Sequence, residues 1–204
     1  MAQPVSRWAP GPAYGPVLSQ TDLYLLQSKL DINPILDIND DTVPLQFHLV
    51  TGAPVSSTAP GRPSEVPGKD EPATLPRVNQ LILISYHSPW CTIIRKEGGV
   101  TVGDVCSTIY REYSDNDITD AEFNSLSQRV QDGVKRAAAT HAAERNPQAW
   151  GAGYYTPHMQ PERLKRLDWL KERVFLEGIE RNDNYAKQRL GFSASNIFIM
   201  NLAQ

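Results

Sequence analysis

The clearest pattern of apolar and polar positions lies between residues 79 and 144. A mostly apolar run from Gln80 to Tyr86 is bounded by Pro76 and Pro89, and a short apolar run between two breakers is typical of a buried strand. The following segment, Trp90 to Lys96, is rich in aromatic and β-branched residues, which suit a pleated surface, and it is followed by a Gly-Gly turn. We therefore expect two neighbouring strands of one sheet.

A helix start follows this turn. The Thr101 hydroxyl can accept a free backbone N–H, and Asp104 places negative charge in the positive first turn. Apolar residues then recur at the three-four spacing of one helix face, namely Val102, Val105, Cys106, Ile109, Tyr110 and Tyr113. The pattern predicts an amphipathic helix that covers the sheet.

A second helix start lies at Thr119, where Thr119 and Glu122 form a capping box. The apolar stripe continues through Phe123, Leu126, Val130, Val134 and Ala137. Asn146-Pro147 ends the pattern, because proline disfavours the α conformation in the residue before it. We expect one continuous helix of about six turns, packed on the same sheet.

Weaker patterns flank this block. Thr21 to Leu30 predicts a short helix capped by its first residue, and Ile35–Ile38 with Val43–Val50 predicts two joined strands. Leucines at helical spacing in Pro161–Phe175 allow a further helix, and Asn196–Leu202 has the composition of a strand that closes the sheet.

Strands at both ends of the central block, with helices between them, predict a single α+β domain with a mostly antiparallel sheet packed by two main amphipathic helices. Residues 1–20 hold four prolines and form a Pro-rich arm, which we expect to be disordered; alternatively, Trp8 and Tyr14 dock it on the domain or on a partner. Residues 21–204 form the domain, with a flexible Pro-rich loop at 51–76.

Length and charge limit the class of protein. The 204 residues suffice for one domain with a sizeable core, and the net charge of −3 argues against nucleic acid or an anionic membrane as a partner. Two cysteines, Cys91 and Cys106, are too few for a disulfide scaffold. There is no secretory signal pattern and no run of eighteen apolar residues. We expect an intracellular, cytoplasmic protein.

The sequence contains only weak motifs for catalysis, metal binding or phosphate binding. His87 and Cys91 lie four residues apart, a pair that in principle serves nucleophilic catalysis or binds a soft metal. No second motif completes a zinc site, and the glycines before Thr101 lack the spacing of a phosphate loop. The carboxylates at 115, 117 and 120 lack the calcium-loop pattern. We therefore expect no metal and no cofactor.

Aromatic side chains on irregular backbone make the best candidate for a recognition surface, because they bury much area with few rotamers to freeze. The candidates are Trp150, Tyr154, Tyr155, His158 and Trp169. The alternative is that they simply cover the core.

Several motifs resemble a known family. They are Ile32–Leu36, the strand leading to Trp90, Gly99-Val100-Thr101-Val102-Gly103-Asp104-Val105, Glu122-Phe123, Arg166–Leu170, Phe175–Ile179 and the closing strand. From about residue 31 to 202 the chain resembles the fungal, basidiomycete-type domain-of-unknown-function family numbered 6699, with a longer insertion at 51–76 and more charge at 171–173. The resemblance implies a small intracellular α+β domain and transfers no catalytic residue.

Two functional hypotheses remain. The preferred one is a noncatalytic protein-interaction or self-association module that uses the aromatic segment 150–169. The alternative is a small-molecule-binding protein or enzyme whose pocket lies between sheet and helices, with His87, Cys91, His158 and Asp168 as its polar side chains. An enzyme needs convergent titratable groups in a pocket, whereas an interaction module needs exposed apolar surface.

Overall fold

The computed structural model describes residues 7–10, 15–40, 45–55, 65–145 and 163–204. Its helices are α1 (Gln20–Leu26), α2 (Val102–Ser114), α3 (Asp120–Asn124), α4 (Gln128–Arg145), α6 (Arg166–Leu170) and α7 (Asp183–Leu190). Its strands are β1 (Asp31–Ile32), β2 (Phe47–His48), β3 (Ala53–Pro54), β4 (Thr74–Leu75), β5 (Gln80–Ser85), β6 (Thr92–Arg95), β7 (Phe175–Glu180) and β8 (Ile197–Ala203).

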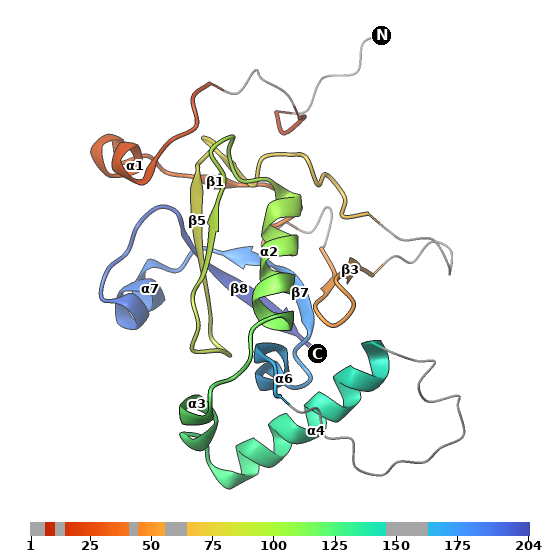
Figure 1. Ribbon diagram of the computed structural model, residues 1–204. Helices are drawn as coiled ribbons and strands as arrows, with labels where there is room; N and C mark the ends of the chain where they lie inside the picture. Colours follow the sequence, from red (N-terminus) through yellow and green to blue (C-terminus); the bar gives the residue numbers. More distant parts are fainter. Residues whose placement is uncertain (1–6, 11–14, 41–44, 56–64, 146–162) are drawn as a thin grey trace.

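Six strands form one sheet in the order β3-β2-β7-β8-β5-β6, and β1 and β4 form a separate pair (Figure 1). All neighbours are antiparallel except β5 and β8, which run parallel with Ile82 opposite Ile197. The last strand in sequence therefore lies inside the sheet, between β5 and β7. The prediction of a single α+β domain with a mostly antiparallel sheet is confirmed.

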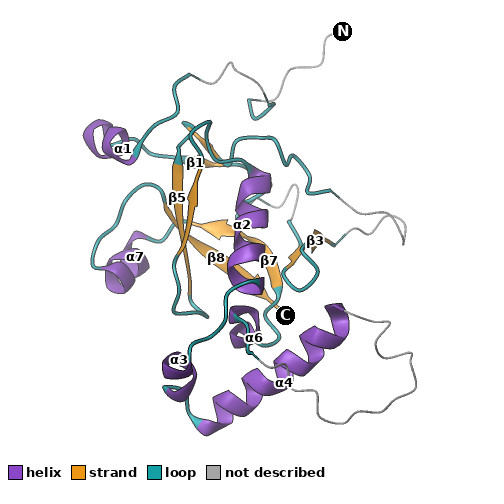
Figure 2. Cartoon of the chain, in the orientation of Figure 1, coloured by secondary structure: helices purple, strands orange, loops and turns teal. Residues whose placement is uncertain are grey.

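Helices cover both faces of the sheet's centre (Figure 2). Alternate residues of a strand point to opposite faces. On one face Leu81, Leu83 and Ile94 join the main core with the apolar side of α2. On the other face Ile84, Ile197 and Ile199 pack with Ala186 of α7. Burial on both faces explains why β8 reads as a nearly continuous apolar run.

Four predicted elements are confirmed. The expected neighbouring strands are β5 and β6, the closing strand is β8, and the helix after the Gly-Gly turn is α2. Thr101 caps α2 as expected: its hydroxyl accepts the backbone N–H of Asp104, and the Asp104 carboxylate accepts the N–H of Thr101 in return.

The prediction of one continuous second helix is wrong, because the chain breaks it into α3 and α4 at residues 125–127. The Ser125 hydroxyl donates to the carbonyl of Glu122, and the Gln131 amide donates to the carbonyls of Phe123 and Leu126. These side chains replace the backbone donors that a continuous helix would supply. After the break, α4 packs mainly across α6 and reaches the sheet through it (Figure 1).

Three further predictions are corrected. Helix α1 is capped by Ser19 rather than Thr21, since the Ser19 hydroxyl accepts from Asp22. The segment 35–38 is a turn and not a strand, because Asn33 accepts the backbone N–H groups of the next residues. The helix expected in 161–175 is limited to α6, and β7 and α7 were not predicted.

The described parts of the arm and the Pro-rich loop contact the domain. Trp8 is buried, and Leu18 exchanges backbone hydrogen bonds with Arg77 and Asn79. The disorder expected for the arm as a whole stays a prediction, and Tyr14 lies outside the described residues. The ends of the 51–76 segment contribute β3 and β4, and its flexibility stays a prediction.

A close backbone approach at Gly178 generates a stability prediction. A Cβ there would lie 2.6 Å from the Leu36 carbonyl oxygen and 3.1 Å from the backbone nitrogen of Ile38. Gly178→Ala should therefore lower the free energy of unfolding by about 2–3 kcal/mol, because backbone atoms have to move apart. Gly98→Ala is the matched control, since a Cβ there meets nothing within 4 Å. Urea denaturation measures both, and equal stability of the two variants would contradict the packing.

Candidate functional site

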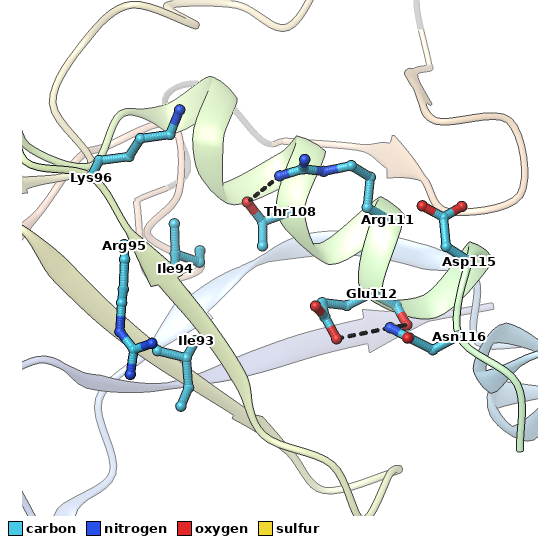
Figure 3. Close-up of a pocket in the computed structure, with 9 residues that line it drawn as sticks. All are labelled: Ile93, Ile94, Arg95, Lys96, Thr108, Arg111, Glu112, Asp115 and Asn116. Carbon is cyan, nitrogen blue, oxygen red and sulfur yellow. Dashed lines mark hydrogen bonds between the residues drawn. The ribbon is translucent and has the colours of Figure 1, made fainter. Parts of the chain in front are cut away.

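A groove of about 430 Å³ runs between the edge strand β6 and helix α2 (Figure 3). One wall is the backbone and side chains of residues 93–96. The other wall is the exposed flank of α2 and the turn after it, made of Thr108, Arg111, Glu112, Asp115 and Asn116. The buried side of α2 packs against the core, which fixes the position of this wall.

The edge of β6 offers backbone groups to this groove. Among the described strands, β6 pairs with β5 and with no other. The backbone N–H of Lys96 donates to Asn79 at the β5 end, and antiparallel pairing alternates, so Thr92 and Ile94 also face β5. Ile93 and Arg95 therefore turn their N–H and C=O groups outward. Among the described residues no hydrogen bond reaches these outward groups.

Some charged side chains in the groove form ion pairs, and others do not. Lys96 lies 3.1 Å from Asp104, and Glu112 lies 3.2 Å from Arg166. Arg95 and Arg111 make no ion pair within the described chain; Arg95 bonds the Gln80 amide and Arg111 the Thr108 hydroxyl. Two guanidinium groups are thus available to an acidic group that lies along β6.

An aromatic cluster lies beside this groove and contains one of the predicted recognition residues, Trp169. Its ring is 5.1 Å from that of Trp90, whose indole N–H donates to Glu122 at 2.7 Å. The Arg166 guanidinium lies 4.9 Å from the Trp90 ring and also pairs with Glu112. The cluster thus joins α3, α6 and the strand end to the groove wall.

The other predicted recognition residues, Trp150, Tyr154, Tyr155 and His158, lie outside the described residues. Trp169 itself is partly buried. The structure therefore leaves the aromatic surface a prediction, and it assigns Trp169 a packing contact with Trp90.

The polar residues of the alternative hypothesis are not brought together. His87 and Cys91 are exposed and share no hydrogen bond within the described chain. They line neither the groove on β6 nor a further groove beside α4. Partial burial raises the pKa of the Cys91 thiol although Arg189 opposes this, whereas nucleophilic cysteines have lowered values. Burial also lowers the pKa of His87.

Asp168 is buried and bonded to a histidine that sequence reasoning missed. Its carboxylate accepts from the Lys165 backbone N–H at 2.7 Å and lies 2.8 Å from Nδ1 of His141 in α4. The other ring nitrogen of His141 lies 2.9 Å from the Lys171 carbonyl oxygen. Both neighbours of the ring are oxygen acceptors, so a ring nitrogen that carries a proton can donate it to one of them. In the sequence, the only indication of this role was that His141 lies at the end of the apolar stripe of the predicted helix.

This pair holds an unusual turn. Lys171 has φ 58° and ψ −114°, and the Arg173 N–H donates to the Leu170 carbonyl, which together define a type II′ turn that normally takes glycine at this position. Such a conformation costs about 1–3 kcal/mol in a non-glycine residue. The hydrogen bond from His141 to the Lys171 carbonyl compensates part of this strain.

In the described chain no three His, Cys, Asp or Glu side chains are grouped so that they can hold a metal ion. No helix in the same residues has the length and apolarity needed to cross a membrane.

The buried pair generates a stability prediction. His141→Ala leaves the Asp168 carboxylate buried without its partner, so the free energy of unfolding at pH 7 should fall by about 3 kcal/mol. His87→Ala removes an exposed histidine and should change it by less than about 0.5 kcal/mol. Urea denaturation of both variants tests this, and a small loss in His141→Ala would show that the pair does not stabilise the α4–α6 contact.

The two thiols should differ in reactivity. Burial raises the pKa of Cys106 to about 12, while Cys91 is exposed. We expect one equivalent of a disulfide reagent to react with the folded protein and the second only after denaturation. The rate at Cys91 should still rise above pH 9, because a raised pKa lowers the thiolate fraction at any lower pH. Cys91→Ser should abolish the reaction of the folded protein; a fast second thiol would contradict the burial.

Comparison with known proteins places the chain in one family. Neither a curated protein nor a solved structure matches the chain significantly. A family model, described as a family of unknown function, matches residues 45–187, which run from just before β2 into α7 and include both walls of the groove. The match covers well over half of the chain, so the expected resemblance is confirmed, while its fungal origin stays an expectation. The chain therefore belongs to the family of unknown function DUF6699.

Proposed function

We propose that this chain is a noncatalytic interaction module that binds an extended peptide segment of a partner protein along β6. The observation that carries the proposal is the outward backbone of Ile93 and Arg95 beside the groove on α2. A peptide that adds a strand to a sheet edge gains main-chain hydrogen bonds, and neighbouring side-chain pockets select its sequence. Two outward residues offer two N–H donors and two C=O acceptors to such a strand.

The groove also supports a preference for acidic peptides. Arg95 and Arg111 have no carboxylate partner in the described chain, whereas Glu112 is neutralised by Arg166. An acidic side chain at every second position of an added strand lies on one face, and it can therefore meet Arg111 across the groove. Asp115 at the far end disfavours a second acidic residue there.

Exposed apolar side chains elsewhere on the domain support a noncatalytic binding role. Tyr24, Leu25 and Leu26 of α1 are 74%, 70% and 63% exposed, and contiguous exposed apolar residues are typical of interaction surfaces. The titratable residues of the enzyme hypothesis that the structure describes do not converge on one pocket. The interaction hypothesis therefore has the stronger physical support.

The edge itself can be tested by a matched pair of substitutions. Peptides are selected from a random library displayed on phage against the full chain, and the enriched sequences are synthesised. Ile93→Pro removes the outward N–H without removing a bond to β5, and edge strands tolerate proline. We expect it to weaken peptide binding about tenfold, since one buried hydrogen bond contributes about 1 kcal/mol and the ring also blocks the edge.

Ile93→Ala is the control, because it removes the same side chain and keeps the N–H. We expect it to bind within about threefold of wild type, equivalent to less than 1 kcal/mol. Fluorescence anisotropy measures the affinities, and amide spectra confirm that each variant is folded. The proposal is wrong if no acidic peptide is enriched, or if the proline and alanine variants bind the selected peptides equally well.

A further inference from the structure

A second groove, separate from the one on β6, lies between α4 and the start of β7. Its volume is about 860 Å³, within the range of sites for small molecules. One wall is a face of α4, and the opposite wall is the Lys171 turn, the first residues of β7 and His48 of β2. We name it the α4 groove.

Three cations gather around one glycine in the α4 groove. Arg129 and Arg136 lie four residues before and three residues after Gly133, so all three share a face of α4. A Cβ on Gly133 would lie 3.3 Å from Cε of Lys171 and 3.7 Å from its Nζ. The Lys171 side chain therefore crosses the helix at Gly133, and the two arginines flank it within about one helical turn on each side.

These cations have no acidic partner in the chain that the structure describes. None of Arg129, Arg136 and Lys171 lies within 4.0 Å of a carboxylate there. Glu144, two turns further along α4, lies 3.7 Å from His48, and Glu172 is exposed beside Lys171. The whole chain carries a net charge of −3, so this cluster does not follow from a generally basic composition. Clustered cations without counter-charge repel one another, and a bound anion relieves that repulsion.

The position of Lys171 is set before any ligand arrives. The buried His141–Asp168 pair holds the Lys171 carbonyl, and the strained turn directs its side chain over Gly133. Strained residues of this kind recur at binding sites, where preorganisation lowers the cost of ordering. The turn thus fixes the point from which the Lys171 side chain enters the α4 groove.

The groove also offers a flat apolar surface. His48 and Phe175 stack across the strand pair β2–β7, with ring centroids 4.7 Å apart and planes 23° from parallel. Partial burial lowers the pKa of His48, Glu144 opposes this, and the charge of His141 adds to it, so the ring is largely neutral at pH 7. A neutral stacked pair can contact an aromatic or apolar group.

We propose that the α4 groove binds a small phosphate-bearing molecule, with the phosphate held by Arg129, Arg136 and Lys171 and the rest of the molecule against His48 and Phe175. A phosphate monoester carries close to two negative charges at pH 7 and three strong acceptor oxygens, which match three cations better than a single carboxylate does. Arginine binds phosphate through paired N–H groups, and lysine binds it as a point charge.

Phenyl phosphate is the probe, because it combines a phosphate monoester with one ring. Titration of the full chain, followed by amide chemical shifts, should give saturable binding with a Kd on the order of 1 mM for so small a ligand. The shifts should centre on residues 129–137 and 171–175. Binding should weaken between 50 and 300 mM salt, roughly the range over which screening of exposed charges becomes strong.

Charge-removing variants locate the site. Arg129→Gln, Arg136→Gln and Lys171→Met should each weaken binding roughly fivefold or more, because each loses a charge-assisted contact. Arg111→Gln is the matched control in the β6 groove and should bind phenyl phosphate like wild type. This control also separates the present site from the proposed peptide site, so either proposal can fail without the other.

Gly133→Ala tests the position of Lys171 in a variant that is expected to stay folded. Alanine favours the helix over glycine, and the added Cβ meets only the flexible end of Lys171. Its stability should equal or exceed that of wild type, while binding falls because the lysine is displaced. Tighter or unchanged binding in this variant would overturn the assigned role of Lys171.

Three outcomes overturn the proposal. The first is an absence of saturable binding up to about ten times the expected Kd. The second is equal binding of phenol, which lacks the phosphate. The third is perturbation of the same amides by phosphatidylserine vesicles but not by phenyl phosphate, which would make the groove a membrane contact instead of a small-molecule site.

Discussion

The arrangement of α4, α6 and the turn at Lys171 depends on the buried carboxylate of Asp168. It caps the start of α6 through the Lys165 N–H and bonds His141 of α4, and His141 in turn holds the Lys171 carbonyl. Asp168 and His141 thus link α6 and the strained turn that follows it to α4, which lies much earlier in the sequence. A buried charge that loses its partner is costly, so these three elements have to be positioned together. The α4 groove lies between α4 on one side and this turn, the start of β7 and His48 on the other.

A second constraint acts on the sheet. Strand β8 is buried on both faces and enters the sheet between β5 and β7, so the strands inside the sheet have no free edge. Strand β6 at the end of the order has one. Natural sheets usually protect such an edge with charge, shortness or a cover. Here β6 is short, carries Arg95 and lies beside α2. Under the proposed function, an added strand therefore has to fit the groove and match its cations.

The two grooves are lined by different helices, α2 and α4, and each contains cations that have no carboxylate partner among the described residues. This combination is typical of binding sites, in which a few polar groups orient a ligand and the scaffold holds them in place. The aromatic cluster around Trp90 belongs to the scaffold, because its indole N–H, its ring and the Arg166 guanidinium tie α3 and α6 to the wall of the β6 groove. The family match over residues 45–187 of this chain includes both walls of the β6 groove.

Local patterns in the sequence determined the elements whose signals are local: the N-cap at Thr101, the apolar run of β5, the aromatic and β-branched composition around β6 and the apolar composition of β8. They also determined the α+β class, because strands and helices each have their own period. Only the tertiary structure decided where the second helix breaks, since the Gln131 side chain completes the end of α3 from a later turn of the chain. It also decided that Asp168 pairs with His141 and that Lys171 meets Gly133. These contacts join positions that lie 27 or more residues apart, or that only packing brings together, and no local period encodes such pairs.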